Sequence, residues 1–421
     1  MTNLTNVWRL NLTYAAAIVN MFTGAATIMP IVMAFHVNSF MGDSWMLLLS
    51  SLAYSFVGDE LLGNVNTTVL SNVAGNCSAY KPDCIGDAQK VLFYTALALI
   101  AIGISGHITS SESFLKQQME IPTPWQVAGG FGMILFPMVG CIALPYIKLW
   151  SVRFGIPAIC TVVATFLFIC GSCSYKHSSK EEEDTKISIR MIPMWMTFIT
   201  HVISIGNTYF LEQAKNMNHK VGKLKVPLPI FKIFYDLVKD YFTKLCVKVT
   251  EKFSGKYLAS CGIMVAMLFS ILCCITAAKM ETRRLDVIRR HCLPDKPNGK
   301  IPMSMFLLLP QYLLLGALDG ISNFSIDYFF TNQVPASMKH YSRFFTYGAI
   351  GTGTMGSVLS VYVVGKISES GGKPSWFQDT LNKSRLDNYY WTLTVLSSIN
   401  LVLYILVALW YNKKCEQSVH S

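Results

Sequence analysis

The sequence predicts an all-α polytopic membrane protein, and three observations lead to this fold class. Hydrophobic residues make up 52% of the 421 residues, and charged residues make up only 14%. Soluble globular chains carry about 25% charged residues. The charges gather in short segments between apolar runs that are long enough, or nearly so, to cross a bilayer core of about 30 Å.

Ten apolar runs are candidate transmembrane helices because each approaches the length that a helix needs to span the hydrocarbon. In chain order they are Ala15–Phe35, Trp45–Leu62, Val91–Gly106, Trp125–Ile147, Phe154–Cys173, Met191–Leu211, Leu258–Ala278, Ile301–Ile321, Phe344–Val364 and Trp391–Tyr411. An eleventh segment, from Pro229 to Leu245, carries apolar residues at helical spacing and charges on the other face. It is either a spanning helix that lines a wet cavity or a helix in the membrane interface. The resemblance described below favours the spanning alternative.

A polar linker divides these segments into two groups. Residues 175–190 contain the charged run Lys180–Thr185, with five apolar runs before it and six segments after it. Two helix bundles joined by a hydrophilic linker are common in secondary transporters. We therefore predict an N-terminal bundle over 1–174, a cytoplasmic linker over 175–190, a C-terminal bundle over 191–411 and a polar tail over 412–421.

The charge and cysteine patterns predict neither a nucleic-acid-binding protein nor a metalloprotein. The net charge is +11, but the Lys and Arg residues are scattered among the loops and form no basic stripe interleaved with aromatic residues. Such loop charge is better explained by anionic lipid. The cysteines show no paired C-x-x-C motifs at zinc spacing, so we predict neither a metal site nor a cofactor.

The orientation signals in the sequence conflict. If eleven segments cross the membrane and the tail is cytoplasmic, the sequons at Asn66, Asn76 and Asn382 face outward and are glycosylation candidates. The same assignment contradicts the positive-inside tendency, because it places four arginines outside: Arg283, Arg284, Arg289 and Arg290. Both orientations therefore stay open.

Asp319 is the first candidate functional residue. It stands at the inner end of the run Ile301–Ile321, and no other charge precedes it in that run. An ionisable group at membrane depth costs several kcal/mol unless it faces a polar cavity or a partner, so it is first interpreted as functional. The alternative is an acid that lies at the water interface.

Several motifs of the chain resemble one transporter family. They are Phe154-GIPA-Ile159, Thr208-YFLEQAKNMN, Pro302-MSMFLLLPQYLLLGALDG and Trp376-FQDTLNKSRLDNYYW. The chain resembles the plant nitrate/peptide transporter family, the plant branch of the proton-dependent oligopeptide transporters in the major facilitator superfamily. The resemblance implies a major facilitator-type two-bundle fold with about 11 of the usual 12 transmembrane helices, because the chain begins at what resembles the second helix. The first helix carries the family's E-x-x-E-R motif, so we expect this motif to be missing.

The resemblance also implies roles for particular residues. Asp319 aligns with a tenth-helix glutamate that is associated with the substrate's amino group in peptide-transporting relatives. His201 and Asn207 are polar residues on the seventh helix, where a histidine is associated with the anion in nitrate-carrying relatives; the alternative for His201 is a hydrogen-bonded structural residue. Ile108 stands where the family's fourth-helix lysine is usual, so the proton-coupling residues are unknown.

The leading functional hypothesis is a secondary transporter of a small polar solute such as nitrate, a peptide or another metabolite. Its expected partners are that solute, lipid and, as a further candidate, protons, in the plasma membrane or the vacuolar membrane. The second hypothesis is a truncated or non-transporting membrane protein that regulates a full-length transporter. An enzyme is not predicted, since the sequence contains no catalytic constellation.

Overall fold

The computed structural model divides the chain into two compact units. Unit 1 consists of Met1–Leu10 and Phe22–Asp184, and unit 2 consists of Asn11–Met21 and Thr185–Ser421. The structure describes residues 4–5, 10–37, 41–56, 87–118, 139, 143, 147, 150–171, 197, 208–221, 224–253, 255, 257–294, 299–333, 341–370 and 372–420.

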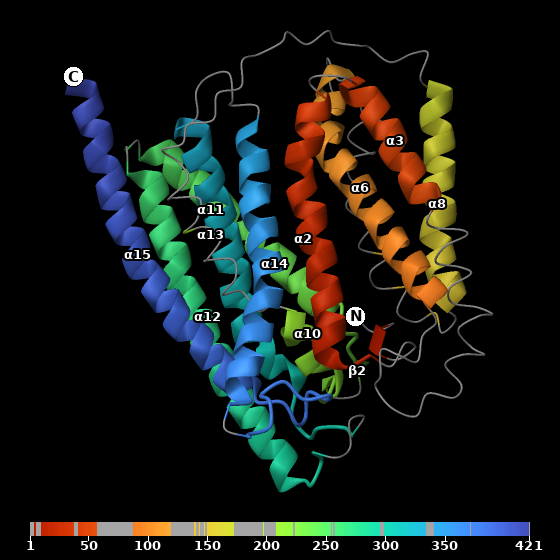
Figure 1. Cartoon of the computed structure of the whole chain (residues 1–421), viewed down its shortest axis with the longest axis vertical. Helices are drawn as coiled ribbons and strands as arrows, with labels where there is room; N and C mark the ends of the chain where they lie inside the picture. Colours follow the sequence, from red (N-terminus) through yellow and green to blue (C-terminus); the bar gives the residue numbers. More distant parts are fainter. Residues whose placement is uncertain are drawn as a thin grey trace. The chain divides into compact units, whose positions relative to one another are not determined.

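Unit 1 is helical in its described part. Its helices are α2 (Leu12–His36, of which the residues to Met21 belong to unit 2), α3 (Gly42–Phe56), α6 (Asp87–Gln118) and α8 (Trp150–Gly171) (Figure 1). Asn11 caps the start of α2, because its Oδ1 accepts a hydrogen bond of 2.8 Å from the backbone N–H of Tyr14. The helices α3 and α6 approach closely at Gly106, where a Cβ would lie 2.8 Å from Cβ of Ser50.

The helices of unit 1 agree with three of the predicted apolar runs and extend some of them. Helix α2 covers the run Ala15–Phe35, and α8 covers most of Phe154–Cys173. Helix α6 is longer at both ends than Val91–Gly106, because its flanking turns are polar and hydropathy does not detect them. The run Trp125–Ile147 lies outside the described residues except for positions 139, 143 and 147.

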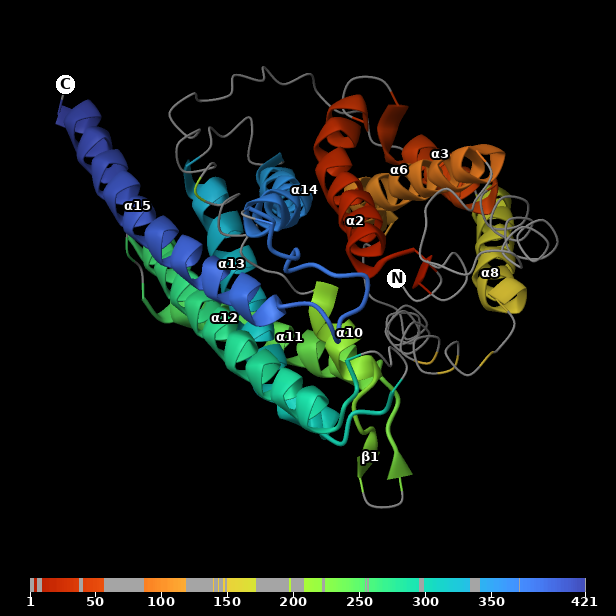
Figure 2. The same ribbon diagram turned by 60° about the horizontal axis from the view of Figure 1, so that its bottom comes forward.

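Unit 2 contains most of the described helices and one small hairpin. Its elements are α10 (Thr208–Lys215), β1 (Lys220–Val221), β2 (Leu224–Lys225), α11 (Ile230–Lys252), α12 (Leu258–Arg290), the 3-10 helix η7 (Met305–Leu308), α13 (Leu309–Gln333), α14 (Ser342–Ser368) and α15 (Leu386–His420). Helix α13 packs against α11, α12 and α14, and α15 packs against α12. The antiparallel pair of β1 and β2 extends away from these helices (Figure 2).

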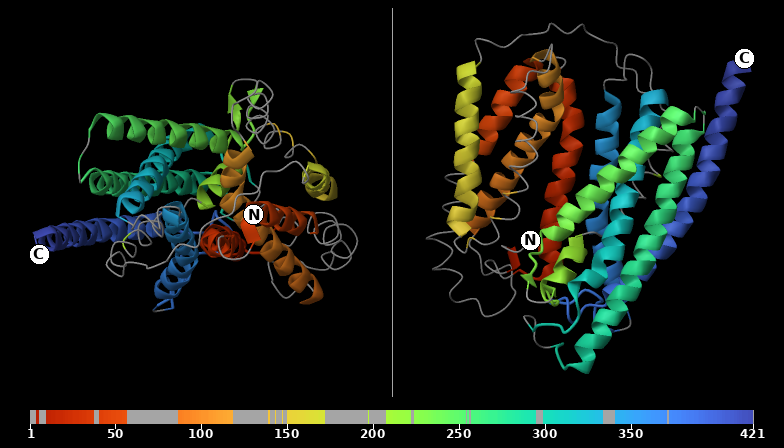
Figure 3. Two further views of the ribbon diagram at one scale, coloured as in Figure 1. Left: turned by 90° about the horizontal axis from the view of Figure 1, so that it is seen from above. Right: turned by 180° about the vertical axis from the view of Figure 1, so that it is seen from behind.

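Six helices in the described residues are long and apolar enough to cross a membrane. The amphipathic helix α11 is not one of these six helices. It packs against α13 and crosses it obliquely (Figure 3, right). Its 23 residues extend over about 35 Å at 1.5 Å per residue. Its packing against a membrane-spanning helix supports the spanning alternative, which stays a prediction.

Two predicted runs in unit 2 end earlier than the helices that contain them. Helix α12 continues beyond Ala278 to Arg290, and α13 continues beyond Ile321 to Gln333. Both continuations contain polar or charged residues, so an apolar pattern does not reveal them. The second one matters for function because it moves Asp319 from the end of a helix to its middle.

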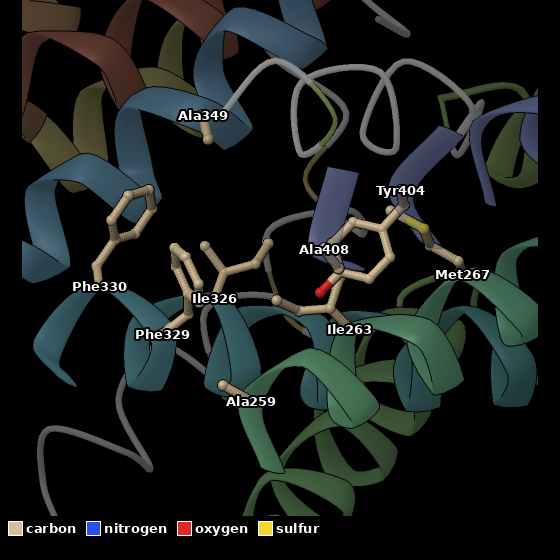
Figure 4. Close-up of a cluster of buried hydrophobic side chains, with 9 residues drawn as sticks. All are labelled: Ala259, Ile263, Met267, Ile326, Phe329, Phe330, Ala349, Tyr404 and Ala408. Carbon is tan, nitrogen blue, oxygen red and sulfur yellow. The ribbon is translucent and has the colours of Figure 1, made fainter. Parts of the chain in front are cut away.

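An apolar core occupies one end of unit 2 (Figure 4). It is formed by Ala259, Ile263 and Met267 of α12, Ile326, Phe329 and Phe330 of α13, Ala349 of α14, and Tyr404 and Ala408 of α15. Asp319 precedes the α13 residues of this core by two helical turns, which is about 10 Å. The acid therefore lies on the helix that contacts the most other helices of unit 2, between the start of that helix and a dry core.

Candidate solute-binding site

Asp319 lies near the middle of α13, and its side chain is partly buried. The helix runs from Leu309 to Gln333, and nearly all of it falls within the candidate span Met305–Asn332. This position disfavours the interfacial alternative for Asp319, since the helix continues well past the acid on both sides. A carboxyl group at this depth needs a polar partner.

The polar partner of Asp319 comes from α11. The hydroxyl of Tyr235 donates a hydrogen bond to Oδ2 of Asp319. Lys239, one turn further along α11, also interacts electrostatically with this carboxyl group. The sequence did not indicate this pairing, because Tyr235 and Asp319 are 84 positions apart.

Two glycines bring α11 this close to α13. A Cβ on Gly316 would lie 2.9 Å from the carbonyl oxygen of Tyr235, and a Cβ on Gly320 would lie 2.5 Å from that of Lys239. Cβ atoms do not tolerate such distances, so these positions require glycine. The pair forms a G-x-x-x-G motif, which lets membrane helices pack backbone to backbone. Asp319 lies between the two glycines in the sequence, directly before Gly320, so α11 approaches α13 closely on both sides of the acid.

A second polar group in unit 2 is a buried ion pair on α12. Glu281 and Arg284 are each 1% exposed. Nε and Nη2 of Arg284 donate to the two carboxylate oxygens of Glu281, both at 2.8 Å. Gln213 of α10 donates to Oε2 of Glu281 at 2.8 Å and accepts from Gln311 of α13 at 3.2 Å. The side chain of Gln213 thereby connects α10 to both α12 and α13.

The same arginine also holds the segment before α15. Its Nη1 donates to Oδ1 of Asn382 at 3.2 Å, and its Nη2 donates to the carbonyl oxygen of Leu381 at 3.0 Å. We call these five polar side chains the Arg284 network: Gln213, Glu281, Arg284, Gln311 and Asn382. Three of the four motif stretches found in the sequence meet here. One signal for the pair is present in the sequence, an acid and an arginine at i, i+3 spacing, but hydropathy places Arg284 among the loop charges.

The Arg284 network includes one glycosylation candidate. Asn382 is only 5% exposed, and its side-chain oxygen accepts a hydrogen bond from Arg284. This burial disfavours a glycan at Asn382, and glycosylation there stays a prediction. The other two candidates, Asn66 and Asn76, lie outside the described residues.

The remaining predicted positions lie outside the described residues or in unit 1. His201 and Asn207 lie outside the described residues, so the anion contact of His201 and the substrate-binding role of Asn207 stay predictions. Ile108 lies on α6 of unit 1 and is partly buried. Within the described part of the chain, no group of three or more His, Cys, Asp or Glu residues is arranged to hold a metal ion.

Comparisons with known proteins agree with the fold and the motifs. The model of the POT family matches residues 177–377. The Arabidopsis thaliana protein named Protein NRT1/PTR FAMILY 5.5 is 34% identical over 510 aligned residues, which cover 98% of this chain and 94% of that relative. The chain belongs to the NRT1/PTR family. The alignment is longer than the 421 residues of this chain. The relative therefore contains segments, between the matched parts, that this chain lacks.

Solved structures with the same fold are transporters of the major facilitator type. The crystal structure of the POT family transporter PepTSo has a TM-score of 0.67 and 15% identity, and covers 95% of this chain and 90% of its own. The nucleoside transporter NupG has a TM-score of 0.58 and 12% identity, and covers 96% of this chain and 92% of its own. These identities support the fold alone.

Membership of the NRT1/PTR family decides between the hypotheses from the sequence. The protein is a multi-pass integral membrane protein and a secondary transporter of small solutes, and it is not an enzyme. The regulatory alternative is not favoured, since the relative and the family model agree on a transporter.

Proposed function

We propose that the transported solute carries a positively charged amino group, as a small peptide does, and that this group binds Asp319. The observation that supports this proposal is the neutral hydrogen-bond donor of the acid, since the nearby Lys239 acts on it only electrostatically among the described contacts. Within the described residues, the hydrogen bond to Asp319 comes from the uncharged hydroxyl of Tyr235. A carboxylate away from bulk water gains more from a bonded cation than from a neutral donor. The ammonium group of a solute provides that cation.

Nitrate fits this site poorly. An anion gains nothing from the carboxylate of Asp319, because like charges repel each other. The charge of Asp319 therefore favours a peptide-like solute over nitrate.

We also propose that protons compete with the solute for Asp319. A proton neutralises the carboxylate as an ammonium group does, so the two exclude each other at this residue. The KM for a cationic solute should then rise when the medium is acidified. A variant without the carboxyl group should lose that dependence.

The Arg284 network has a mechanical role in this proposal. Secondary transporters expose a midplane site to each side in turn by moving helix bundles. Because the network bonds α10, α12, α13 and the segment before α15 to one another, we propose that they move together. Asp319 then moves with α13 as part of a rigid group of helices.

The test is uptake of radiolabelled dialanine into oocytes that express the protein. Asp319→Asn removes the charge and keeps the shape, and hydrogen bonds to charged groups contribute about 1.5–3 kcal/mol, so uptake at low concentration should fall at least about tenfold. Asp240→Asn is the matched control, because Asp240 is exposed on α11. N-acetyl-dialanine, which lacks the ammonium group, should not be taken up. Unchanged dialanine uptake by Asp319→Asn, at equal surface expression, would refute the proposal.

A further inference from the structure

Tyr235 stands where the charged group of a solute would bind. Its hydroxyl donates to Oδ2 of Asp319, and its side chain is partly buried. The ammonium group of Lys232 lies 5.9 Å from the centroid of its ring. The ring is therefore placed between a cation on its own helix and the acid on α13.

Backbone contacts between α11 and α13 hold Tyr235 in this position. Gly316 and Gly320 allow α11 to approach α13 on both sides of Asp319. The hydroxyl of Thr243 adds a hydrogen bond to the carbonyl oxygen of Gly320 at 3.4 Å. Since these contacts fix α11 at a short distance from α13, the hydroxyl of Tyr235 reaches the carboxyl group.

The chemistry of this contact implies competition. A solute ammonium that approaches Oδ2 of Asp319 along the direction that the phenol occupies replaces the phenol, because two donors cannot share one lone pair. The exchange is favourable for a full positive charge, since charge-assisted hydrogen bonds are about twice as strong as neutral ones. It is not favourable for a neutral donor, which only replaces one neutral bond by another.

We propose that Tyr235 determines specificity: its hydroxyl bonds to Asp319, and only a cationic donor displaces it. This inference rests on the proposed function, and it adds the residue that excludes neutral solutes. It predicts that removing a polar group from the site raises the affinity for solutes. Loss of the hydroxyl should strengthen the binding of solutes and weaken the discrimination between them.

Tyr235→Phe is the decisive variant, because it removes one oxygen and keeps the ring between the helices. The KM for dialanine should fall about tenfold, as the solute no longer displaces a hydrogen bond to a charged group. N-acetyl-dialanine should become a weak substrate. Tyr241→Phe is the matched control, since Tyr241 is an exposed tyrosine on the same helix, and its KM should stay unchanged.

The background variant Asp319→Asn separates this inference from the proposed function. If Tyr235 acts through Asp319, adding Tyr235→Phe to Asp319→Asn should change neither KM nor selectivity. A higher or unchanged KM in Tyr235→Phe, with uptake still dependent on Asp319, overturns the inference and leaves the proposed function intact. Uptake that is independent of Asp319, or absent for dialanine in the unsubstituted protein, overturns both. The shift in melting temperature that dialanine causes in each purified variant gives a second measure of how tightly that variant binds dialanine.

Discussion

The Glu281–Arg284 pair and Asp319, both in the described part of unit 2, are charged groups whose hydrogen-bond partners differ. The Glu281–Arg284 pair is 1% exposed at each residue, and Arg284 bonds to a carboxylate, a backbone carbonyl and a side-chain amide. Asp319 has a neutral phenol as its hydrogen-bond donor among the described residues, and its side chain is only partly buried. A charge whose bonds are completed by the protein holds the fold together. A charge with a neutral donor remains able to bind a ligand.

The largest loss of stability should follow from removing one partner of the Glu281–Arg284 ion pair. Arg284→Met leaves Glu281 buried without its counter-charge, which typically costs about 3–5 kcal/mol. The melting temperature of the purified protein in detergent should fall strongly. Arg289→Met is the control, since Arg289 is 58% exposed in its pair with Asp286 and such pairs contribute about 0–1 kcal/mol. Equal tolerance of the two substitutions would show that the network is not structural. The double variant Glu281→Met with Arg284→Met should regain much of the loss, because no unpaired charge remains.

The next effect concerns the glycines beside Asp319. Gly320→Ala places a Cβ 2.5 Å from the carbonyl oxygen of Lys239, so α11 must move away. Overpacking of this kind costs about 1–3 kcal/mol, and the melting temperature should fall accordingly. In Gly365→Ala the nearest atom, Cδ2 of Phe377, lies at an ordinary 3.5 Å, so stability should be kept or slightly increased. A neutral Gly320→Ala would argue against close packing of α11 on α13.

A smaller effect is expected at Asn382. Asn382→Ala removes one acceptor from Arg284, and a hydrogen bond to a charged group contributes about 1.5 kcal/mol at the low end of its range. Thermal unfolding of the purified protein measures this loss. Treatment with a glycosidase should shift the electrophoretic mobility of the unsubstituted protein and of Asn382→Ala by the same amount. A shift that disappears in Asn382→Ala would show that Asn382 carries a glycan and that this end of unit 2 is arranged differently.

The sequence predicted the helices better than their ends. Apolar runs indicated α2, α12, α13, α14 and α15, because hydropathy reports which residues avoid water. It did not indicate that α12 reaches Arg290 or that α13 reaches Gln333, since polar residues within a bundle resemble loop residues in a hydropathy pattern. The position of Asp319 at mid-helix was missed for this reason.

The site was predicted only in part. Asp319 was identified from its isolation in an apolar run, which is a local signal. The hydrogen bonds that form the site join positions 68 to 98 residues apart. They are the bonds Tyr235–Asp319, Gln213–Glu281, Gln213–Gln311 and Arg284–Asn382. Such contacts follow from how the helices pack, and a single sequence carries no direct signal for them.

The most direct test of this contrast compares two properties of Asp319→Asn in the same preparation. The melting temperature should stay near that of the unsubstituted protein, because an amide can still accept the hydrogen bond of Tyr235, while dialanine uptake should fall at least about tenfold. The melting temperature of Arg284→Met should fall well below that of Asp319→Asn. If Asp319→Asn unfolds as readily as Arg284→Met, or transports dialanine as well as the unsubstituted protein, Asp319 is not the residue that binds the solute.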